Sequence, residues 1–298
     1  MIEAVPNVSE GRRPEIVEAL LAAVAGVPRA VLLDYSSDPS HNRSVFTIVG
    51  DGGAVHEAIL RLVDVAVRHI DLRNHRGAHP RIGAVDVVPF IPLDGATMAD
   101  CVALAHVTAR SISELFGVPV YLYEEAATRP TRRRLESIRR GEFEGLTARM
   151  ATPEWQPDFG PCMPHASAGA TVVGARTPLI AFNVDLDSAT LDDARHIAAV
   201  VRESSGGLRA VKALGLWLPH RATAQVSMNL TDFATTSVVA AFDAVVQAAR
   251  SRGVGVRESE LIGLIPAAAL AGTTPEQIKL TAFDRSQILE ERIRLLAR

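Results

Sequence analysis

The chain has 298 residues, of which 48% are hydrophobic and 22% are charged, and its formal net charge at pH 7 is −3. This length allows about two domains of ~150 residues, with enough apolar residues for a sizeable core. The charge balance excludes the strongly basic surface that is typical of nucleic-acid binding, so we expect no nucleic-acid partner.

The sequence also bears on cellular location. The first residues, MIEAVPNVSEGRR, lack the apolar core of a signal peptide, and no apolar run approaches the ~20 residues of a membrane span. The two cysteines are in neither a CxxC nor a zinc spacing. Cys101 falls in a helical pattern and is predicted to be a core residue, whereas Cys162 falls in a loop. We therefore expect a cytoplasmic protein without a disulfide or a membrane partner.

In the first half, apolar periodicity predicts strands and helices in alternation. The expected strands cover residues 2–6, 30–35, 43–49, 84–90 and 118–123, and the expected helices cover 13–24, 54–72 and 98–116. Ser9 is placed to cap the first of these helices.

The second half restarts the pattern, with strands over 179–184, 208–217, 224–229 and 254–257 and helices over 191–203 and 235–252. This β-α-β-β-α-β order is that of the split β-α-β, or ferredoxin-like, arrangement. The first half opens with the same order and then adds a helix and a strand. We predict the α/β (α+β) class, with two ferredoxin-like α/β sandwich subdomains, each a mixed, antiparallel-rich sheet with helices on one face. The boundary is expected near 174–178, which gives subdomains 1–177 and 178–298.

Six arginines gather between Arg129 and Arg140, in TRPTRRRLESIRRGEFEGL. One interpretation is the solvated face of a helix. The other is a positive rim that attracts a polyanionic ligand.

A crowded polar loop, NHRGAHPRIGAVD, precedes the strand predicted at 84–90. His75 and His79 are four residues apart, a spacing that binds zinc when both lie on one helix. Gly77 and Pro80 oppose a helix here, and the preceding helix is expected to end by about Asn74. We therefore expect no metal at this loop.

A proton-transfer site agrees better with this loop. Gly77 and Gly83 permit close backbone approach to a ligand, and an imidazole near its reference pKa of about 6.5 exchanges protons at neutral pH. Asp86 would orient a histidine or cap the strand. The alternative is a structural loop histidine that hydrogen-bonds to the backbone.

Four further polar clusters interrupt the apolar pattern. They are PNVSEG at 6–11, DYSSDPSHNR at 34–43, DFGPCMPHASAG at 158–169 and QVSMNLTD at 225–232. The first is interpreted as an anion-binding turn or a plain helix cap with a buried Asn, and the second as a functional cluster or a hairpin. The third is a functional or mobile loop, and the fourth lines a groove or is a half-solvated strand. The sequence contains no GxSxG, P-loop or GxGxxG motif that would indicate another chemistry.

Taken together, these motifs resemble the glutamate formimidoyltransferase (formiminotransferase) family, from Glu3 to about Leu270. The segments that carry the resemblance are VPNVSEGRRPEIVEAL, LLDYSSDPSHNRSVFTIVGD, IDLRNHRGAHPRIGAVDVVPFIPL, VPVYLYEEAA, IRRGEFEGL, PDFGP, GATVVGARTPLIAFNVDL, AQVSMNLTDF and ELIGLIP. The resemblance implies two α/β subdomains and the single-function form without a cyclodeaminase domain.

The resemblance also implies an activity: transfer of a formimino group from N-formimino-L-glutamate to N5 of tetrahydrofolate in histidine degradation, with tetrahydrofolate as co-substrate and no metal. The family's catalytic histidine maps onto His79 in GAHPR. Because both substrates carry carboxylates, nearby cationic and amide side chains are expected to bind them: Asn7, Asn42, Arg43, Arg76 and Arg81. The folate-binding loop maps onto Gly160, Pro161, Cys162, Met163, Pro164, His165, Ala166, Ser167, Ala168 and Gly169. Exposed sheet edges favour a homodimer.

Three positions depart from the family pattern. Ala78 stands where relatives commonly have Glu, Ser36 where they often have a second acid, and Ala168 where they often have Trp. These departures keep two alternatives open. One is a paralogue that uses another one-carbon donor, such as formylglutamate or a formyl-folate, and the other is a non-catalytic folate-binding protein.

Overall fold

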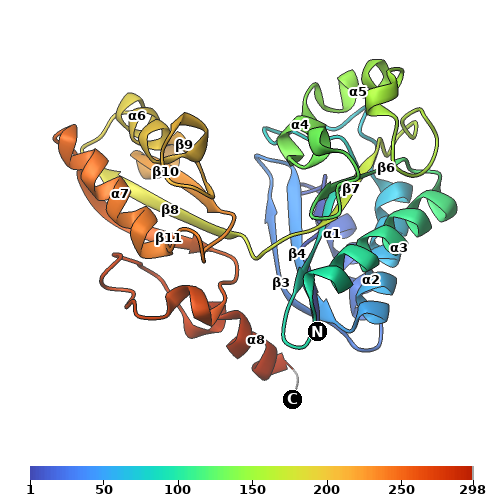
Figure 1. Cartoon of the computed structure of the whole chain (residues 1–298), viewed down its shortest axis with the longest axis horizontal. Helices are drawn as coiled ribbons and strands as arrows, with labels where there is room; N and C mark the ends of the chain where they lie inside the picture. Colours follow the sequence, from blue (N-terminus) through green and yellow to red (C-terminus); the bar gives the residue numbers. More distant parts are fainter. Residues whose placement is uncertain (297–298) are drawn as a thin grey trace. The chain divides into compact units, whose positions relative to one another are not determined.

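The computed structural model describes residues 1–296, and the chain divides into two compact units, Met1–Arg176 and Thr177–Arg298 (Figure 1). The predicted boundary followed residue 177. None of the helices within the described residues is both long and apolar enough to cross a membrane.

The first unit combines a large sheet with five α-helices over its described residues. Its elements are β1 (Ile2–Ala4), β2 (Asn7–Val8), α1 (Pro14–Ala25), β3 (Ala30–Asp38), β4 (Arg43–Gly50), α2 (Gly52–His69), β5 (Val85–Pro92), α3 (Met98–Phe116), β6 (Val120–Glu124), α4 (Leu135–Arg139), α5 (Glu142–Met150) and β7 (Thr171–Ala175).

Strand order in this sheet is β3, β4, β1 together with β2, β5, β7 and β6. β1 and β2 both pair antiparallel with β4 and β5, so the strand predicted at 2–6 is divided in two. The order of β1, β3, β4 and β5 is ferredoxin-like, as predicted. The sequence analysis missed β7, which lies parallel to and between β5 and β6. This strand brings the loop before it alongside the start of β5, where Gly169 bridges Gly83.

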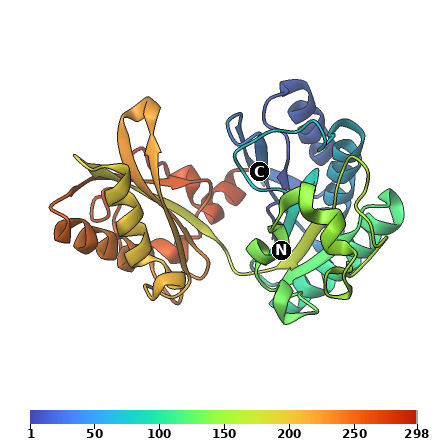
Figure 2. The same cartoon turned by 90° about the horizontal axis from the view of Figure 1, so that it is seen from above.

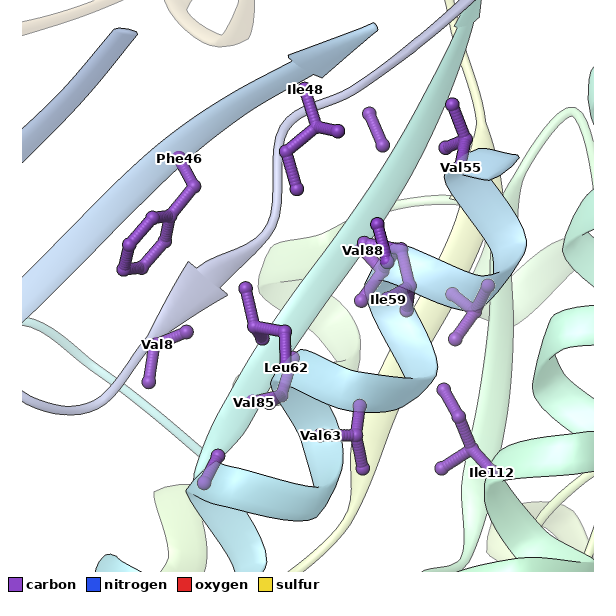
Figure 3. Packing of buried hydrophobic residues seen from close by; sticks show 14 of the residues in the cluster. Val8, Phe46, Ile48, Val55, Ile59, Leu62, Val63, Val85, Val88 and Ile112 are labelled. Atoms are coloured by element: carbon purple, nitrogen blue, oxygen red, sulfur yellow. The ribbon is translucent and has the colours of Figure 1, made fainter. Parts of the chain in front are cut away.

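Helices α1, α2 and α3 cover one face of this sheet. Figure 3 shows Ile59, Leu62 and Val63 of α2 against Val85 and Val88 of β5. Alternate residues of β5, β6 and β7 point to the opposite face, where α4 and α5 pack on a separate apolar cluster. The predicted layer of helices is therefore present, but two short helices also cover the other face. One of them, α4, lies in the arginine-rich segment for which a helix was one interpretation.

Capping explains where these helices begin. The Asp51 carboxylate accepts a hydrogen bond from the Ala54 N–H at the start of α2, at 2.9 Å. α1 begins after Arg13 with no side-chain cap, so the prediction that Ser9 caps it is wrong. The Ser9 hydroxyl instead donates to the Gly83 carbonyl at 2.7 Å, and the Glu10 carboxylate accepts from the backbone N–H groups before the helix.

The second unit confirms the ferredoxin-like prediction directly. Its elements are β8 (Ile180–Asp187), α6 (Leu191–Val201), β9 (Val211–Leu218), β10 (Thr223–Leu230), α7 (Val238–Ser251), β11 (Gly255–Ile262) and α8 (Leu289–Leu296). The sheet is antiparallel, in the order β11, β8, β10, β9. Figure 2 shows the strands and helices of this unit from a second direction. Phe182 of β8 and Val226 of β10 are buried in a cluster that includes residues of α6 and α7.

The other face of this second sheet carries a charged network beside exposed apolar residues such as Leu214 and Leu216. The Gln225 amide donates to Asp185 at 2.8 Å and to Glu260 at 2.9 Å, and the Arg221 guanidinium lies 2.7 Å from both Asp185 and Glu258. In the segment QVSMNLTD, alternate residues face the core, and Gln225 on the other face joins this charged network.

Candidate active site

The polar loop of residues 71–84 connects α2 to β5 and is pinned against the turn between β3 and β4. α2 ends at His69, so His75 and His79 share no helix and the geometry for helical zinc binding is absent. The Ala78 N–H donates to the Ser40 carbonyl at 3.2 Å. A Cβ atom on Gly77 would lie 2.1 Å from the His41 carbonyl oxygen, so only glycine permits this approach.

His75 is a structural histidine within this loop. It is buried, its Nε2–H donates to the Asn42 carbonyl at 2.9 Å, and its Nδ1 accepts from the Arg81 guanidinium at 3.2 Å. Burial lowers its pKa, against the opposing effect of the Asn42 carbonyl. Because both ring nitrogens are occupied, His75 supports the loop and has no free position for a ligand.

Arg81 is held by two glutamates of α5. Its guanidinium lies 2.7 and 2.8 Å from the two Glu144 carboxylate oxygens and 2.8 Å from Glu142. These groups and Arg76 line a surface hollow of about 400 Å³. The expectation that Arg81 binds a substrate carboxylate therefore conflicts with its environment, because its donors already face carboxylates of the chain.

His79 is half-buried and faces Arg43, the first residue of β4. The Arg43 Nη1 atom lies 2.5 Å from the His79 Nε2 atom. A guanidinium has donors only, so Nε2 must accept and the imidazole is neutral, with its proton on Nδ1. The His41 ring lies edge-on to His79, with ring centroids 6.3 Å apart.

The environment of His79 strongly disfavours its protonated form. Burial and the positive charges of Arg43, Arg139 and His41 lower its pKa to about 3. The expectation of an imidazole near its reference pKa of about 6.5 is therefore wrong for the protein without a ligand. It is a neutral acceptor at pH 7, and any ligand that neutralises the arginines would raise its proton affinity.

Arg139 is the residue of this site that sequence reasoning missed. It lies at the end of α4. Its Nε donates to the Asp86 carboxylate at 2.8 Å, and its Nη2 forms an ion pair with the same carboxylate oxygen. The other Asp86 oxygen accepts from the Ile82 N–H at 2.7 Å. Asp86 thus contacts no histidine: one oxygen pairs with Arg139, and the other accepts a backbone N–H from the loop just before β5. A buried carboxylate in β5 requires a partner, but the sequence does not indicate which of the six arginines supplies it.

The arginine-rich segment is not simply a solvated face. Arg132 has 0% of its surface exposed, pairs with Asp158 at 3.0 Å and donates to the backbone carbonyls of Glu154 and Gln156. Its guanidinium also lies over the Tyr121 ring, 5.1 Å from the centroid. This buried clamp fixes the PDFGP segment, and Arg133, Arg134 and Arg140 are the exposed members.

The loop from Gly160 to Gly169 returns to the His79 loop at its end. Gly160 has φ +92° and packs against Ser113. The backbone of His165 pairs with that of Gly169, and the His165 Nδ1 accepts from the Ala168 N–H at 3.0 Å.

This loop has an exposed part and an anchored part. Pro161, Cys162, Met163 and Ala166 are exposed, and Pro164 and Ser167 are half-buried. Ala168 is only 2% exposed and belongs to the core, so a change at this position alters packing beneath the loop. Met163 is 65% exposed and is the loop's large apolar side chain on the surface.

Of the remaining predicted residues, Asn42 and Asn7 hold the backbone through their side-chain amides, whereas Arg76 is exposed. The Asn42 side chain accepts from the Gly11 N–H at 3.0 Å and donates to the Arg76 carbonyl at 3.1 Å, so it joins three loops. The Asn7 amide donates to the Val5 carbonyl at 3.0 Å within its own turn. Arg76 is exposed and its guanidinium donates to backbone carbonyls, including that of His75 at 2.8 Å.

Both cysteines are free thiols. Cys101 is buried, as predicted, and burial raises its pKa to about 11, whereas Cys162 is exposed. Over the described residues, no group of three or more His, Cys, Asp or Glu side chains is placed to hold a metal ion.

Two family models match the chain. The formiminotransferase domain, N-terminal subdomain, matches residues 1–176, and the formiminotransferase domain matches residues 181–294. The chain belongs to the formiminotransferase family. The motifs that carry the resemblance lie in both matches, GAHPR and PDFGP in the first and AQVSMNLTDF and ELIGLIP in the second.

Curated relatives agree with this assignment. The glutamate formimidoyltransferase of Streptococcus pyogenes serotype M1 is 44% identical over 98% of this formiminotransferase and 98% of its own length. That of Thermoplasma acidophilum is 41% identical over 98% and 97%. The formimidoyltransferase-cyclodeaminase of Gallus gallus is 43% identical over 98% of this chain, which spans 54% of that protein.

A solved microcompartments protein from Desulfitobacterium hafniense DCB covers 88% of this chain and 93% of its own. Its TM-score is 0.24 at 14% identity, which is too low to carry an argument.

Proposed function

We propose that this chain transfers the formimino group of N-formimino-L-glutamate to N5 of tetrahydrofolate, giving 5-formimidoyltetrahydrofolate and L-glutamate. The observation that carries the proposal is the neutral His79 imidazole, whose acceptor nitrogen lies 2.5 Å from the Arg43 guanidinium in a chain of the formiminotransferase family. Two of its relatives bear the name glutamate formimidoyltransferase over nearly their whole length.

The reaction needs one proton carrier. The bond that forms joins N5 to the formimino carbon, and the bond that breaks joins that carbon to the glutamate nitrogen. His79 accepts the proton that the attacking amine loses and delivers it to the departing glutamate nitrogen. A positioned acid–base group of this kind typically contributes ~10²–10⁴-fold to the rate.

The rest of the catalysis is assigned to positioning. The exposed part of the 160–169 loop, with Met163, is proposed to contact the folate, and Arg43 is proposed to contact a carboxylate. Arg76 remains a candidate for a second carboxylate, because its guanidinium is exposed and donates only to backbone carbonyls. We also propose that the protein is cytoplasmic and that it forms a homodimer. Light scattering on the purified protein would test the dimer.

The test is turnover of N-formimino-L-glutamate with and without tetrahydrofolate, followed by release of L-glutamate. Release that requires tetrahydrofolate is expected. N-formyl-L-glutamate is assayed beside it, because Ala78 lies next to His79 and is exposed. Faster turnover of the formyl donor would replace the proposal with the paralogue alternative, and folate binding without turnover of either donor would replace it with a non-catalytic role.

A further inference from the structure

The Arg43 guanidinium contacts His79, and the Arg139 guanidinium lies close enough for its charge to act on both His79 and Arg43. Arg139 is paired with Asp86, whose second oxygen accepts a backbone N–H. Arg43 forms no ion pair with a carboxylate anywhere in residues 1–296, and its one side-chain partner there is the imidazole of His79. The Asp38 carboxylate is turned to His41, with which it pairs at 2.6 Å.

The charges that act on His79 come from Arg43 of β4, His41 of the turn before it and Arg139 of α4. Two carboxylates, Asp38 of that turn and Asp86 of β5, act on Arg43. Burial and the charge of Arg139 lower the pKa of Arg43, while Asp86 and Asp38 raise it. Among the described residues, Arg43 therefore has no carboxylate at ion-pair distance although it is largely buried, which is the charge pattern of an anion site.

We infer that Arg43 and Arg139 form a subsite for the α-carboxylate of the glutamate donor, and that this carboxylate takes the Arg43 guanidinium in place of the His79 nitrogen. The inference rests on the proposed function and names the residues that select its donor. The subsite adds to the role of His79, because it names the ligand group that the neighbouring arginines bind.

Geometry favours the α-carboxylate over the side-chain carboxylate. The α-carboxylate and the nitrogen that carries the formimino group are both attached to Cα. A carboxylate bound at Arg43 therefore holds that nitrogen beside the imidazole, because Arg43 and His79 are in direct contact at 2.5 Å. A bidentate arginine–carboxylate pair also fixes the orientation of the group.

Binding and protonation of His79 are then coupled. In the free protein Arg43 donates to Nε2, so a proton cannot occupy that nitrogen without displacing it. A carboxylate that draws Arg43 away frees Nε2 and adds a negative charge nearby. Binding and protonation are linked. If the ligand raises the pKa of His79 by one pH unit, it must bind the protein with protonated His79 ten times more tightly than the protein with neutral His79. L-Glutamate should therefore bind more tightly as the pH falls below the pKa of the complex.

The experiment compares two probes that differ only in the α-carboxylate, L-glutamate and 4-aminobutyrate. The pKa of His79 is measured by NMR of ring-labelled histidine in the full chain, with His79→Asn identifying the signal. L-Glutamate is expected to raise the pKa of His79 by at least one unit, and 4-aminobutyrate to leave it within a few tenths of its value in the free protein.

Variants test the two cations. Arg43→Gln keeps the Arg139–Asp86 pair intact and should weaken L-glutamate binding at least tenfold while raising the free His79 pKa. Arg139→Lys keeps a charge for Asp86 but removes the guanidinium fork, and should weaken binding less. Arg140→Gln, at the exposed neighbouring position, is the matched control and should bind like the parent.

The inference is overturned if both probes shift His79 equally, if L-glutamate binds without a shift, or if Arg43→Gln binds it unchanged. These readouts need no turnover. Loss of transfer with the shift intact would therefore contradict the proposed function alone, and transfer without a shift would contradict the subsite alone.

Discussion

His75 and His79 lie four residues apart in one loop and have opposite surroundings. Both ring nitrogens of His75 are held, one by the Asn42 carbonyl and the other by Arg81, whose charge two glutamates balance. The acceptor nitrogen of His79 instead faces Arg43, a cation without its own carboxylate in the described chain. The first arrangement is electrically complete, and the second requires an anion.

This difference separates a side chain that maintains the loop from one that reacts. Satisfied hydrogen bonds stabilise His75 in a single protonation state. An unneutralised cation beside His79 makes its proton affinity depend on what binds. Substitutions on the two sides should therefore change different quantities, stability for the His75 side and rate for the His79 side.

The largest expected effect is on the rate in His79→Asn. Loss of the proton carrier should lower kcat for formimino transfer by ~10²–10⁴-fold, because asparagine cannot accept and return a proton. The side chain is half-buried and its hydrogen bond joins the loop only to Arg43, the first residue of β4, so the fold should persist. Steady-state glutamate release and the circular dichroism of the variant are the measurements.

His41→Asn is the companion variant, since His41 is a neighbouring imidazole and is paired with Asp38. If His41→Asn lost a comparable rate while His79→Asn stayed active, His41 and not His79 would be the residue that transfers the proton.

The fold was largely predictable because it depends on local patterns. The order of strands and helices in both units follows from the apolar period, and the second unit has the predicted topology. β7 was missed because Thr171–Ala175 is a short, small-residue run whose strand character comes from parallel pairing with β5 and β6. Nonlocal pairing of that kind leaves little periodicity to detect.

The site was predictable only in part. GAHPR marks His79, but whether a loop histidine is satisfied depends on residues far along the chain. Arg139 is 60 positions from His79 and reaches it because α4 packs over β5. Likewise, the sequence places Arg43 and Arg81 alike near the loop, and only the contacts of Glu142 and Glu144 distinguish them.

The second expected effect is on stability in His75→Leu. Removing the imidazole leaves the buried Asn42 carbonyl and the Arg81 Nε without partners, which should lower the free energy of unfolding of the first unit by about 1–3 kcal/mol. The measurement is urea unfolding at pH 8 in a Trp217→Phe background, so that Trp155 reports on the first unit.

His69→Leu is the matched control, because His69 is exposed at the end of α2 and should change stability by no more than about 0.5 kcal/mol. Equal losses in the two variants would mean that the hydrogen bonds of His75 contribute nothing specific.

The third effect is a pH dependence of stability that belongs to His79. Its pKa is about 3 in the folded chain, against about 6.5 when unfolded, so the unfolded chain binds a proton that the folded chain does not. The stabilising effect is complete above about pH 6.5 and is lost as the pH falls. His79→Asn should therefore show a shallower decline than the parent, by up to about 1.4 kcal/mol per pH unit between pH 6 and 4. Parallel curves for parent and variant would show that the arginines do not act on His79 in the free protein.

The smallest effect concerns the two glutamates that hold Arg81. The hydrogen bond from Arg81 lowers the pKa of Glu144 to about 2, against the opposing effect of burial. Glu144 meets the guanidinium with both oxygens, whereas Glu142 uses one. Both carboxylates are exposed, which limits each to about 1 kcal/mol or less. Glu144→Gln should therefore destabilise the first unit slightly more than Glu142→Gln, and this difference should vanish as the pH falls from about 4.5 towards 2.

Neither variant should alter the pKa of His79, because Arg81 faces His75. A shift of His79 in either one would show that the two sides of the loop are electrically coupled, and the contrast between the histidines would then be one of degree.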